Sequence, residues 1–328
     1  ALTLPAVSGA VDFICGIIAS APVKLYKKKD GKVEEVANDI RVKLLNIDTG
    51  DTLDAFQMKK AMFEDYLLGK GGYAYINRNK NENEVKSLHY IEDSKVTVEK
   101  NTDPIFKYVR FRVENRVYKN YEMIKILRNS KDGASGKGLI DEISKALETA
   151  YSTLIYQLGL VKSGGNKKGF LQSDKRLGQD EIDTLKKAWN NLYKNNEDNI
   201  VILNNGLTFK ESSNSSVEMQ MNESKKTLND DINNVFHIHS DFNLTYKEAL
   251  YPIITAFETA LNNTLLLEKE KKQYYFRVDT KEITKAGFKE RNEGYKIAKE
   301  AGYMTVNEIR KAEDLDYIDG MDVINIDR

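Results

Sequence analysis

Two long amphipathic stretches, separated by a compact segment that reads as strand, helix and strand, occupy residues 139–236. The first stretch has apolar residues at helical spacing, at Leu139, Ile143, Ala146, Leu147, Ala150, Leu154, Leu158 and Val161. At roughly 1.5 Å per residue this helix would run on the order of 37 Å before Gly164-Gly165 ends it. The second stretch, 217–236, has an apolar face formed by Met221, Leu228, Ile232 and Val235. A helical hairpin with a small module at its tip indicates a shaft rather than a catalytic pocket.

Composition excludes several classes of protein. The chain has 328 residues, of which 41% are hydrophobic, enough for the cores of two or three domains. Lys and Arg total 50 and Asp and Glu total 50, so the formal net charge is zero and a tight, stationary nucleic-acid binder is disfavoured. The single cysteine, Cys15, cannot form an intrachain disulfide and favours a reducing compartment.

The apolar run 6–21 is short, contains Asp12 and is followed by its charges rather than preceded by them. A membrane span would need about twenty apolar residues, and a signal peptide would place its charges first. We therefore predict a buried helix here and no membrane segment elsewhere.

The pattern predicts an α+β fold. A helix from the N-cap Asp54 to Gly69 precedes alternating stretches between 73 and 127, which indicate an antiparallel meander in a mixed α/β region. The loop 129–138 ends that region. The inserted module reads as a strand at 169–172, a helix at 179–193 and a hairpin at 200–210. Beyond the second stretch we expect a helix at 246–267, kinked by Pro252, a strand at 274–278, a helix at 287–301, and a last helix that starts at a Thr305–Glu308 capping box.

Few residues point to chemistry. His237 and His239 have a His-x-His spacing, but no cysteine or carboxylate cluster in the sequence completes a metal shell, so we predict no metal. Gly136-Lys137-Gly138 lacks the upstream glycine and the following Ser or Thr of a phosphate loop. With no triad, metal box or paired acids, the sequence predicts neither an enzyme nor a cofactor.

Several segments, taken in order, resemble one known family. They are Ala21-Pro22-Val23-Lys24-Leu25-Tyr26, Leu67 to Ile76 with its Gly69-Lys70-Gly71-Gly72 turn, Gly169-Phe170-Leu171, Val201 to Leu207, and Ala301 to Arg310 followed by Gly320-Met321-Asp322. The chain resembles the portal proteins of tailed bacteriophages with Hong Kong 97-like capsids. This resemblance implies a ring, usually a dodecamer, that serves as the DNA gateway at one capsid vertex.

The resemblance implies a division of the chain. Residues 1–138 would form a wing, 139–164 and 213–236 two stem helices, 165–212 a clip, 237–268 a tunnel loop with a long helix, and 269–328 a C-terminal region on the wing or crown side. Many relatives have a Val-Pro-Pro element and a longer polar segment where this chain has His237 to Phe242, so the shape of the tunnel constriction stays open.

The resemblance also implies partners and contacts. The partners would be further copies of the chain, double-stranded DNA, the terminase large subunit, a head–tail adaptor, and the major capsid protein or a scaffold. The chain would act in the virion after assembly in the host cytoplasm. Candidate DNA contacts are His237, His239 and Asn243 in the tunnel loop and Lys225 and Lys226 in the stem, with Lys167, Lys168, Lys175 and Arg176 as clip contacts to DNA or an adaptor.

Simple geometry is compatible with a channel. About twelve stem helices spaced about 10 Å apart around a circle leave a passage near 28 Å, wider than a B-form duplex. A zero net charge also fits sliding, because each neutralised phosphate adds affinity and hence drag. Two alternatives remain open, a nucleotide-dependent enzyme of nucleic-acid metabolism and an assembly scaffold without DNA passage.

Overall fold

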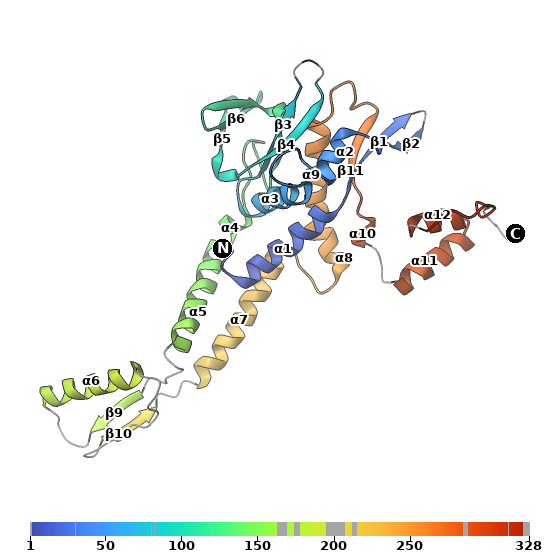
Figure 1. The fold of residues 1–328 in the computed structure, drawn as a ribbon. Coiled ribbons are helices and arrows are strands. Elements are labelled where there is room, and N and C mark those ends of the chain that lie inside the picture. The colour runs from blue at the N-terminus through green and yellow to red at the C-terminus, as the bar shows by residue number, and fades with distance from the viewer. Residues whose placement is uncertain are drawn as a thin grey trace.

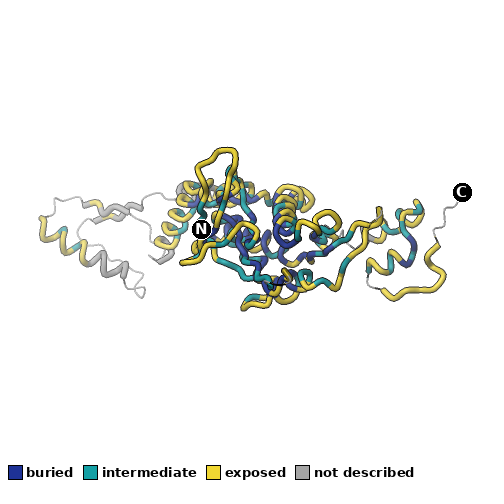
Figure 2. Tube along the Cα trace, turned by 90° about the horizontal axis from the view of Figure 1, so that it is seen from above, coloured by how far each residue is buried: buried dark blue, intermediate teal, exposed yellow. Residues whose placement is uncertain are grey.

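The computed structural model describes residues 2–29, 31–79, 81, 83–162, 169–173, 178–194, 207–211, 215–284, 288–313 and 315–323. The chain is elongated (Figure 1). A compact head contains α1 to β8 together with α9 and β11; a stem of two helices, α5 and α7, leads from it to a tip that contains β9, α6 and β10. Buried residues concentrate in the head (Figure 2).

The head begins with helix α1 (Pro5–Ser20), which starts with a proline in its first turn. Its buried residues include Val7, Val11, Ile14, Cys15 and Ile18, so the predicted buried helix is confirmed. Helix α1 packs on α3 (Ala55–Leu68). The side chain of Asp54 accepts a hydrogen bond from the backbone N–H of Gln57 at 2.7 Å, which confirms the predicted N-cap.

The strands after α3 are antiparallel, as predicted, but they form two sheets instead of one meander. Strands β3 (Gly72–Arg78), β4 (Val85–Ile91) and β8 (Met123–Ile126) form the order β4-β3-β8, and β5 (Val96–Lys100), β6 (Val109–Val113) and β7 (Arg116–Lys119) form the second sheet. Two short 3-10 turns, η1 (Asp93–Lys95) and η2 (Asn120–Glu122), adjoin β5 and β8. The meander is interrupted because β8 pairs with β3, with Tyr73 opposite Lys125.

A third sheet joins distant parts of the chain. Strand β1 (Val23–Lys29) pairs with β2 (Lys32–Glu35) on one side and with β11 (Tyr274–Val278) on the other. Helix α2 (Ile40–Asn46) lies beside β1. Helix α9 (Tyr251–Thr264) contacts both β8 and β11. Helix α9 and strand β11, which lie in the expected segments 237–268 and 269–328, thus pack with elements of residues 1–138.

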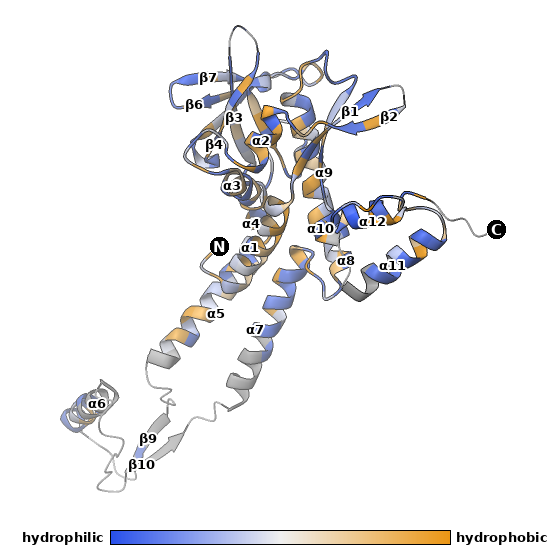
Figure 3. Cartoon of the chain, turned by 45° about the vertical axis from the view of Figure 1, so that its right-hand side comes forward, coloured by the Kyte–Doolittle hydropathy of each residue, from blue (hydrophilic) through white to orange (hydrophobic). Residues whose placement is uncertain are grey.

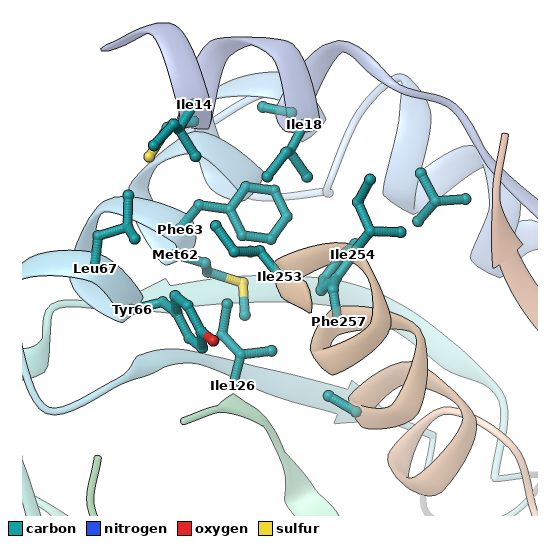
Figure 4. Packing of buried hydrophobic residues seen from close by; sticks show 14 of the residues in the cluster. Ile14, Ile18, Met62, Phe63, Tyr66, Leu67, Ile126, Ile253, Ile254 and Phe257 are labelled. Carbon is teal, nitrogen blue, oxygen red and sulfur yellow. The ribbon is translucent and has the colours of Figure 1, made fainter. Parts of the chain in front are cut away.

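The main core forms where α1, α3, β8 and α9 meet (Figure 4). Ile14 and Ile18 of α1 face Phe63 of α3, whose ring meets that of Phe257 of α9 edge to face, with centroids 5.1 Å apart and an interplanar angle of 81°. Such aromatic pairs contribute beyond the area they bury. Residues nearly two hundred positions apart in the sequence thus hold the head together.

The stem follows a short helix, α4 (Leu139–Glu142), and consists of α5 (Ser144–Lys162) and α7 (Ser215–Val235), which contact each other. The two predicted long helices are confirmed, except that Ile143, with φ −111° and ψ 19°, interrupts the first. In the tip, β9 (Gly169–Ser173) pairs antiparallel with β10 (Leu207–Glu211), and α6 (Gln179–Lys194) lies between them in sequence. The predicted strand at 200–203 lies outside the described residues.

The segment after α7 is more helical than predicted. Helix α8 (Phe242–Thr245) and a π turn, η3 (Tyr246–Leu250), run directly into α9, so the helix predicted from 246 begins at 242. After α10 (Lys281–Thr284), helices α11 (Phe288–Glu300) and α12 (Val306–Ala312) lie beside the head (Figure 1). The Thr305–Glu308 capping box is confirmed. None of the described helices is long and apolar enough to cross a membrane.

Candidate functional site

The base of the stem is fixed to the head by a close backbone approach. A Cβ atom on Gly138 would lie 2.4 Å from the carbonyl oxygen of Leu68, so only glycine fits where α4 starts beside the end of α3. Arg128 donates to the Glu142 carboxylate at 3.0 Å, and Asn129 donates to it at 3.1 Å. The hydrogen bond from Arg128 is the main cause that lowers the pKa of Glu142. The direction of the stem is therefore set by the head.

Helix α5 carries two apolar stripes. One comprises Leu147, which is buried, and Ala150 and Leu154, which pack against the head core. The second comprises Tyr151, Ile155 and Leu158, which are 48%, 48% and 46% exposed and follow one another at helical spacing. Figure 3 shows apolar residues along α5. In the part of the chain that the structure describes, nothing covers this second stripe. A helix whose outer face meets only water usually has polar residues there.

Helix α7 is more polar. Lys225, Lys226, Asp230 and Asp231 are all exposed on it, so its cations are matched by anions one turn further along. Lys225 borders a hollow between the start of α1 and the two stem helices, whose other lining residues include Leu4, Leu154 and Ile232. The predicted lysine pair is thus accessible, and one of its members lies at a junction within the subunit.

The predicted tunnel loop begins where α7 ends. The backbone N–H of His237 donates to Asn234 at 3.0 Å and that of Ile238 to Asn233 at 2.9 Å, which is the hydrogen-bond pattern of a Schellman C-cap. His237 has φ 54° and takes the left-handed position that usually holds glycine. The chain then enters α8, whose N-cap Asp241 accepts from the Asn243 N–H at 2.8 Å; Asn243 is therefore the second residue of this helix, and it is exposed.

The fold brings a carboxylate to the two histidines. His239 Nε2 lies 2.8 Å from Glu248 Oε2, and His237 Nδ1 lies 3.6 Å from the same oxygen. The ligand atoms of these three residues all lie within 4.8 Å of one another, the one such grouping of at least three His, Cys, Asp or Glu residues in the described part of the chain. The sequence predicts no metal because no carboxylate cluster accompanies the histidine pair along the chain. In the folded chain, Glu248 in the π turn supplies a carboxylate.

The other predicted contacts are not gathered with the loop. Lys226 lies on α7, eleven residues before His237, which corresponds to roughly 17 Å along an α-helix. Lys167, Lys168, Lys175 and Arg176 lie outside the described residues, so their role stays a prediction. Sequence reasoning missed Glu248 because nine residues and a helix start separate it from His239, and no fixed spacing relates a loop to a π turn.

Comparison with known proteins agrees with this architecture. A family model described as phage portal protein matches residues 5–314. The fold is similar to a Hong Kong 97 family phage portal protein from Corynebacterium diphtheriae, with a TM-score of 0.64 at 14% identity over 86% of this chain and 94% of that one. A chain in the virion of a native gene transfer agent particle has a TM-score of 0.64 at 16% identity, covering 97% of this chain and 92% of that chain.

A third similar structure is the neck of the native gene transfer agent particle, computed with C12 symmetry, with a TM-score of 0.60 at 14% identity over 97% of this chain and 93% of that chain. The comparison with curated protein sequences gives no match. The head, the paired stem helices and the tip define an elongated subunit of the kind found in these particles. The chain belongs to the phage portal protein family, as the match over residues 5–314 shows.

Proposed function

We propose that this chain is the subunit of a ring-shaped portal at one vertex of a capsid, through which double-stranded DNA enters and leaves. The observation that carries the proposal is the second apolar stripe of α5, formed by Tyr151, Ile155 and Leu158. A side-by-side copy of the stem would cover it, because the stripe runs along the helix on a face that the subunit's own hairpin leaves exposed.

Family membership and ring geometry support the same assembly. The neck computed with C12 symmetry contains a similar fold. With about twelve copies and helices about 10 Å apart, the stems would enclose a passage near 28 Å. The Lys225-Lys226 pair of α7, followed by Asp230-Asp231, suits a wall along which DNA slides, since balanced charge limits the number of phosphates held at once.

Within this proposal the earlier division of the chain applies in function. Residues 1–138 act as the wing, 139–164 and 213–236 as the stem, 165–212 as the clip, 237–268 as tunnel loop and helix, and 269–328 as the C-terminal region. The clip faces a head–tail adaptor and the terminase large subunit, and the wing faces the major capsid protein or a scaffold. The subunit is a structural part of the virion, assembled in the host cytoplasm, and has no catalytic activity.

Electron microscopy of the purified full-length chain, together with sedimentation velocity, tests the proposal. A closed ring with an open axis wide enough for a duplex is the expected result. A chain that stays monomeric at every concentration and salt condition would contradict the proposal, and a ring with a sealed axis would favour a non-conducting scaffold. ATP hydrolysis or nuclease activity of the pure chain would instead favour the nucleic-acid enzyme.

The loop contacts have their own test. Replacing His239 and Asn243 by Ala is expected to alter DNA packaging or retention while rings still form, because both residues lie beyond the stem stripe. Packaging that is unchanged in this double variant would remove the tunnel-loop assignment. Replacing Lys226, which lies on α7, by Ala tests DNA contacts of the stem separately from those of the loop.

A further inference from the structure

We infer that His237, His239 and Glu248 form a binding site for a divalent cation of the zinc class. The chain contains three histidines, and two of them meet a carboxylate here. Two imidazoles and one carboxylate are a donor set that Zn²⁺ uses in proteins, with water in the remaining position. Mg²⁺ and Ca²⁺ prefer oxygen ligands only, so a nitrogen-rich site selects against them.

Two of the three distances between ligand atoms lie near those around a tetrahedral ion. Ligand atoms about 2.0 to 2.2 Å from a shared zinc ion lie roughly 3.3 to 3.5 Å from one another. The two separations involving Glu248 Oε2, 2.8 Å to His239 Nε2 and 3.6 Å to His237 Nδ1, lie on either side of that range. Small rotations of the three side chains would open the centre for a cation in place of the direct contact between His239 and Glu248.

The backbone at His237 points to a site as well. This residue has φ 54° at the position after the end of α7, where glycine would avoid the steric cost of a Cβ atom. A histidine here adds nothing to the Schellman hydrogen bonds, which use backbone atoms alone. Residues kept in such conformations concentrate at functional sites. The turn therefore does not use the His237 ring, whose Nδ1 instead lies 3.6 Å from Glu248 Oε2.

The opposite wall is also irregular. Glu248 lies in the π turn Tyr246–Leu250, closed by a hydrogen bond from the Tyr251 N–H to the Tyr246 carbonyl. In a regular helix the ring of Pro252 would clash with the carbonyl of residue 248, four positions before it. The wide turn relieves that clash, and π turns recur at functional sites. Its effect here is to place the Glu248 carboxylate over the end of α7.

The two walls are held together without a metal. The backbone N–H of His239 donates to the Thr245 hydroxyl at 2.8 Å, and the Thr245 side chain is buried. The Thr245 hydroxyl in turn donates to the carbonyls of His239 and Asp241, each at 3.2 Å. These hydrogen bonds connect the loop that carries His239 to the helix that leads to Glu248. The connection pre-orients the ligands.

A bound cation would join the end of α7 to the start of α9 and stiffen the loop between them. It would also make the local charge more positive, since the ion brings two positive charges to the site. In a portal ring these charges would face the DNA phosphates. This last consequence rests on the proposed function, whereas the site itself rests only on residues of one subunit.

The test is a titration of the full-length chain, stripped with EDTA, with ZnCl₂ by isothermal calorimetry and by thermal unfolding, with MgCl₂ as comparison. One zinc ion per chain and a rise in Tm with zinc but not magnesium are expected. Co²⁺ should give the visible absorption of a four-coordinate site. A chain that binds no zinc at 100-fold excess, or that binds Mg²⁺ equally well, overturns the inference.

Matched variants locate the site. His237→Gly keeps the left-handed turn while it removes a ligand, and Glu248→Gln keeps the shape of the side chain; each should weaken zinc binding at least tenfold. His89→Gln is the control, because the remaining histidine lies near Asp51 and Ser87 in the head. Zinc binding that survives both site variants, or that His89→Gln abolishes, overturns the assignment. Ring formation, measured by sedimentation on the same samples, reports separately on the proposed function.

Discussion

Replacing Ile155 by Lys should prevent ring assembly while the subunit stays folded. Ile155 is 48% exposed and belongs to the uncovered stripe of α5. Complete burial of an isoleucine side chain stabilises by about 1.5–3 kcal/mol, so covering the exposed half contributes about 1 kcal/mol at each interface. A ring of about twelve subunits contains as many copies of this interface, so the loss reaches about 12 kcal/mol for the ring, before the cost of desolvating the lysine is added.

The subunit itself should tolerate the change. Lysine has a higher helix propensity than isoleucine, and the side chain makes no contribution to the head core. Circular dichroism should therefore give an unchanged helix content and Tm, while sedimentation velocity shows rings replaced by monomers or small oligomers.

The same substitution on the other face of the helix is the control. Leu154 packs against the core of the head, so Leu154→Lys should lower the free energy of unfolding of the subunit by about 2 kcal/mol. If Ile155→Lys assembles into rings at the same concentration as the unchanged chain, the stripe is not the interface. A drop in Tm for Ile155→Lys equal to that of Leu154→Lys would show that the stripe is covered within one subunit.

Three further predictions concern the head and stem. Burial lowers the pKa of Lys59 from 10.5 to about 8, so the unfolded chain binds more protons than the folded chain between these pH values. The free energy of unfolding, measured with urea, should therefore rise by about 2 kcal/mol from pH 7 to 9.5, and Lys59→Met should lack this rise. A Cβ atom on Gly72 would lie 2.2 Å from a backbone oxygen of α3, so Gly72→Ala should lower the free energy of unfolding by at least about 3 kcal/mol. Gly159 in α5 has open space around it, so Gly159→Ala should raise that free energy by about 0.5–1 kcal/mol. Thermal melts of the two variants compare them directly. The Arg41 side chain is 11% exposed and pairs with two carboxylates, whereas Arg112 belongs to an exposed pair. In chemical denaturation, Arg41→Met should lower the free energy of unfolding by about 3 kcal/mol and Arg112→Met by less than about 1 kcal/mol. Equal losses would refute the role of burial.

Local patterns were sufficient for most individual elements. The apolar spacing of α1, α5 and α7, the N-cap at Asp54 and the capping box at Thr305 are properties of a few consecutive residues, and the structure confirms them. The order of these elements also carried the family resemblance that the match over residues 5–314 shows. Hydrophobic period and capping act over one or two turns, so sequence alone reveals them.

The failures share a cause. The local patterns did not indicate that β11 pairs with β1 or that α9 contacts β8. They placed β8 in a meander, although β8 returns to β3. Pairing between strands depends on which edges and faces are left uncovered after collapse, and no local pattern records that.

By itself the sequence determined the kinds of helix and strand, the shaft-like hairpin and the neutral charge balance, because these follow from residue type and short-range period. Only the tertiary structure decided that Glu248 meets His237 and His239, since a Schellman turn and a π turn together set that meeting. The same holds for the second stripe of α5, because an amphipathic pattern identifies apolar positions, whereas packing alone decides which of them the subunit leaves uncovered.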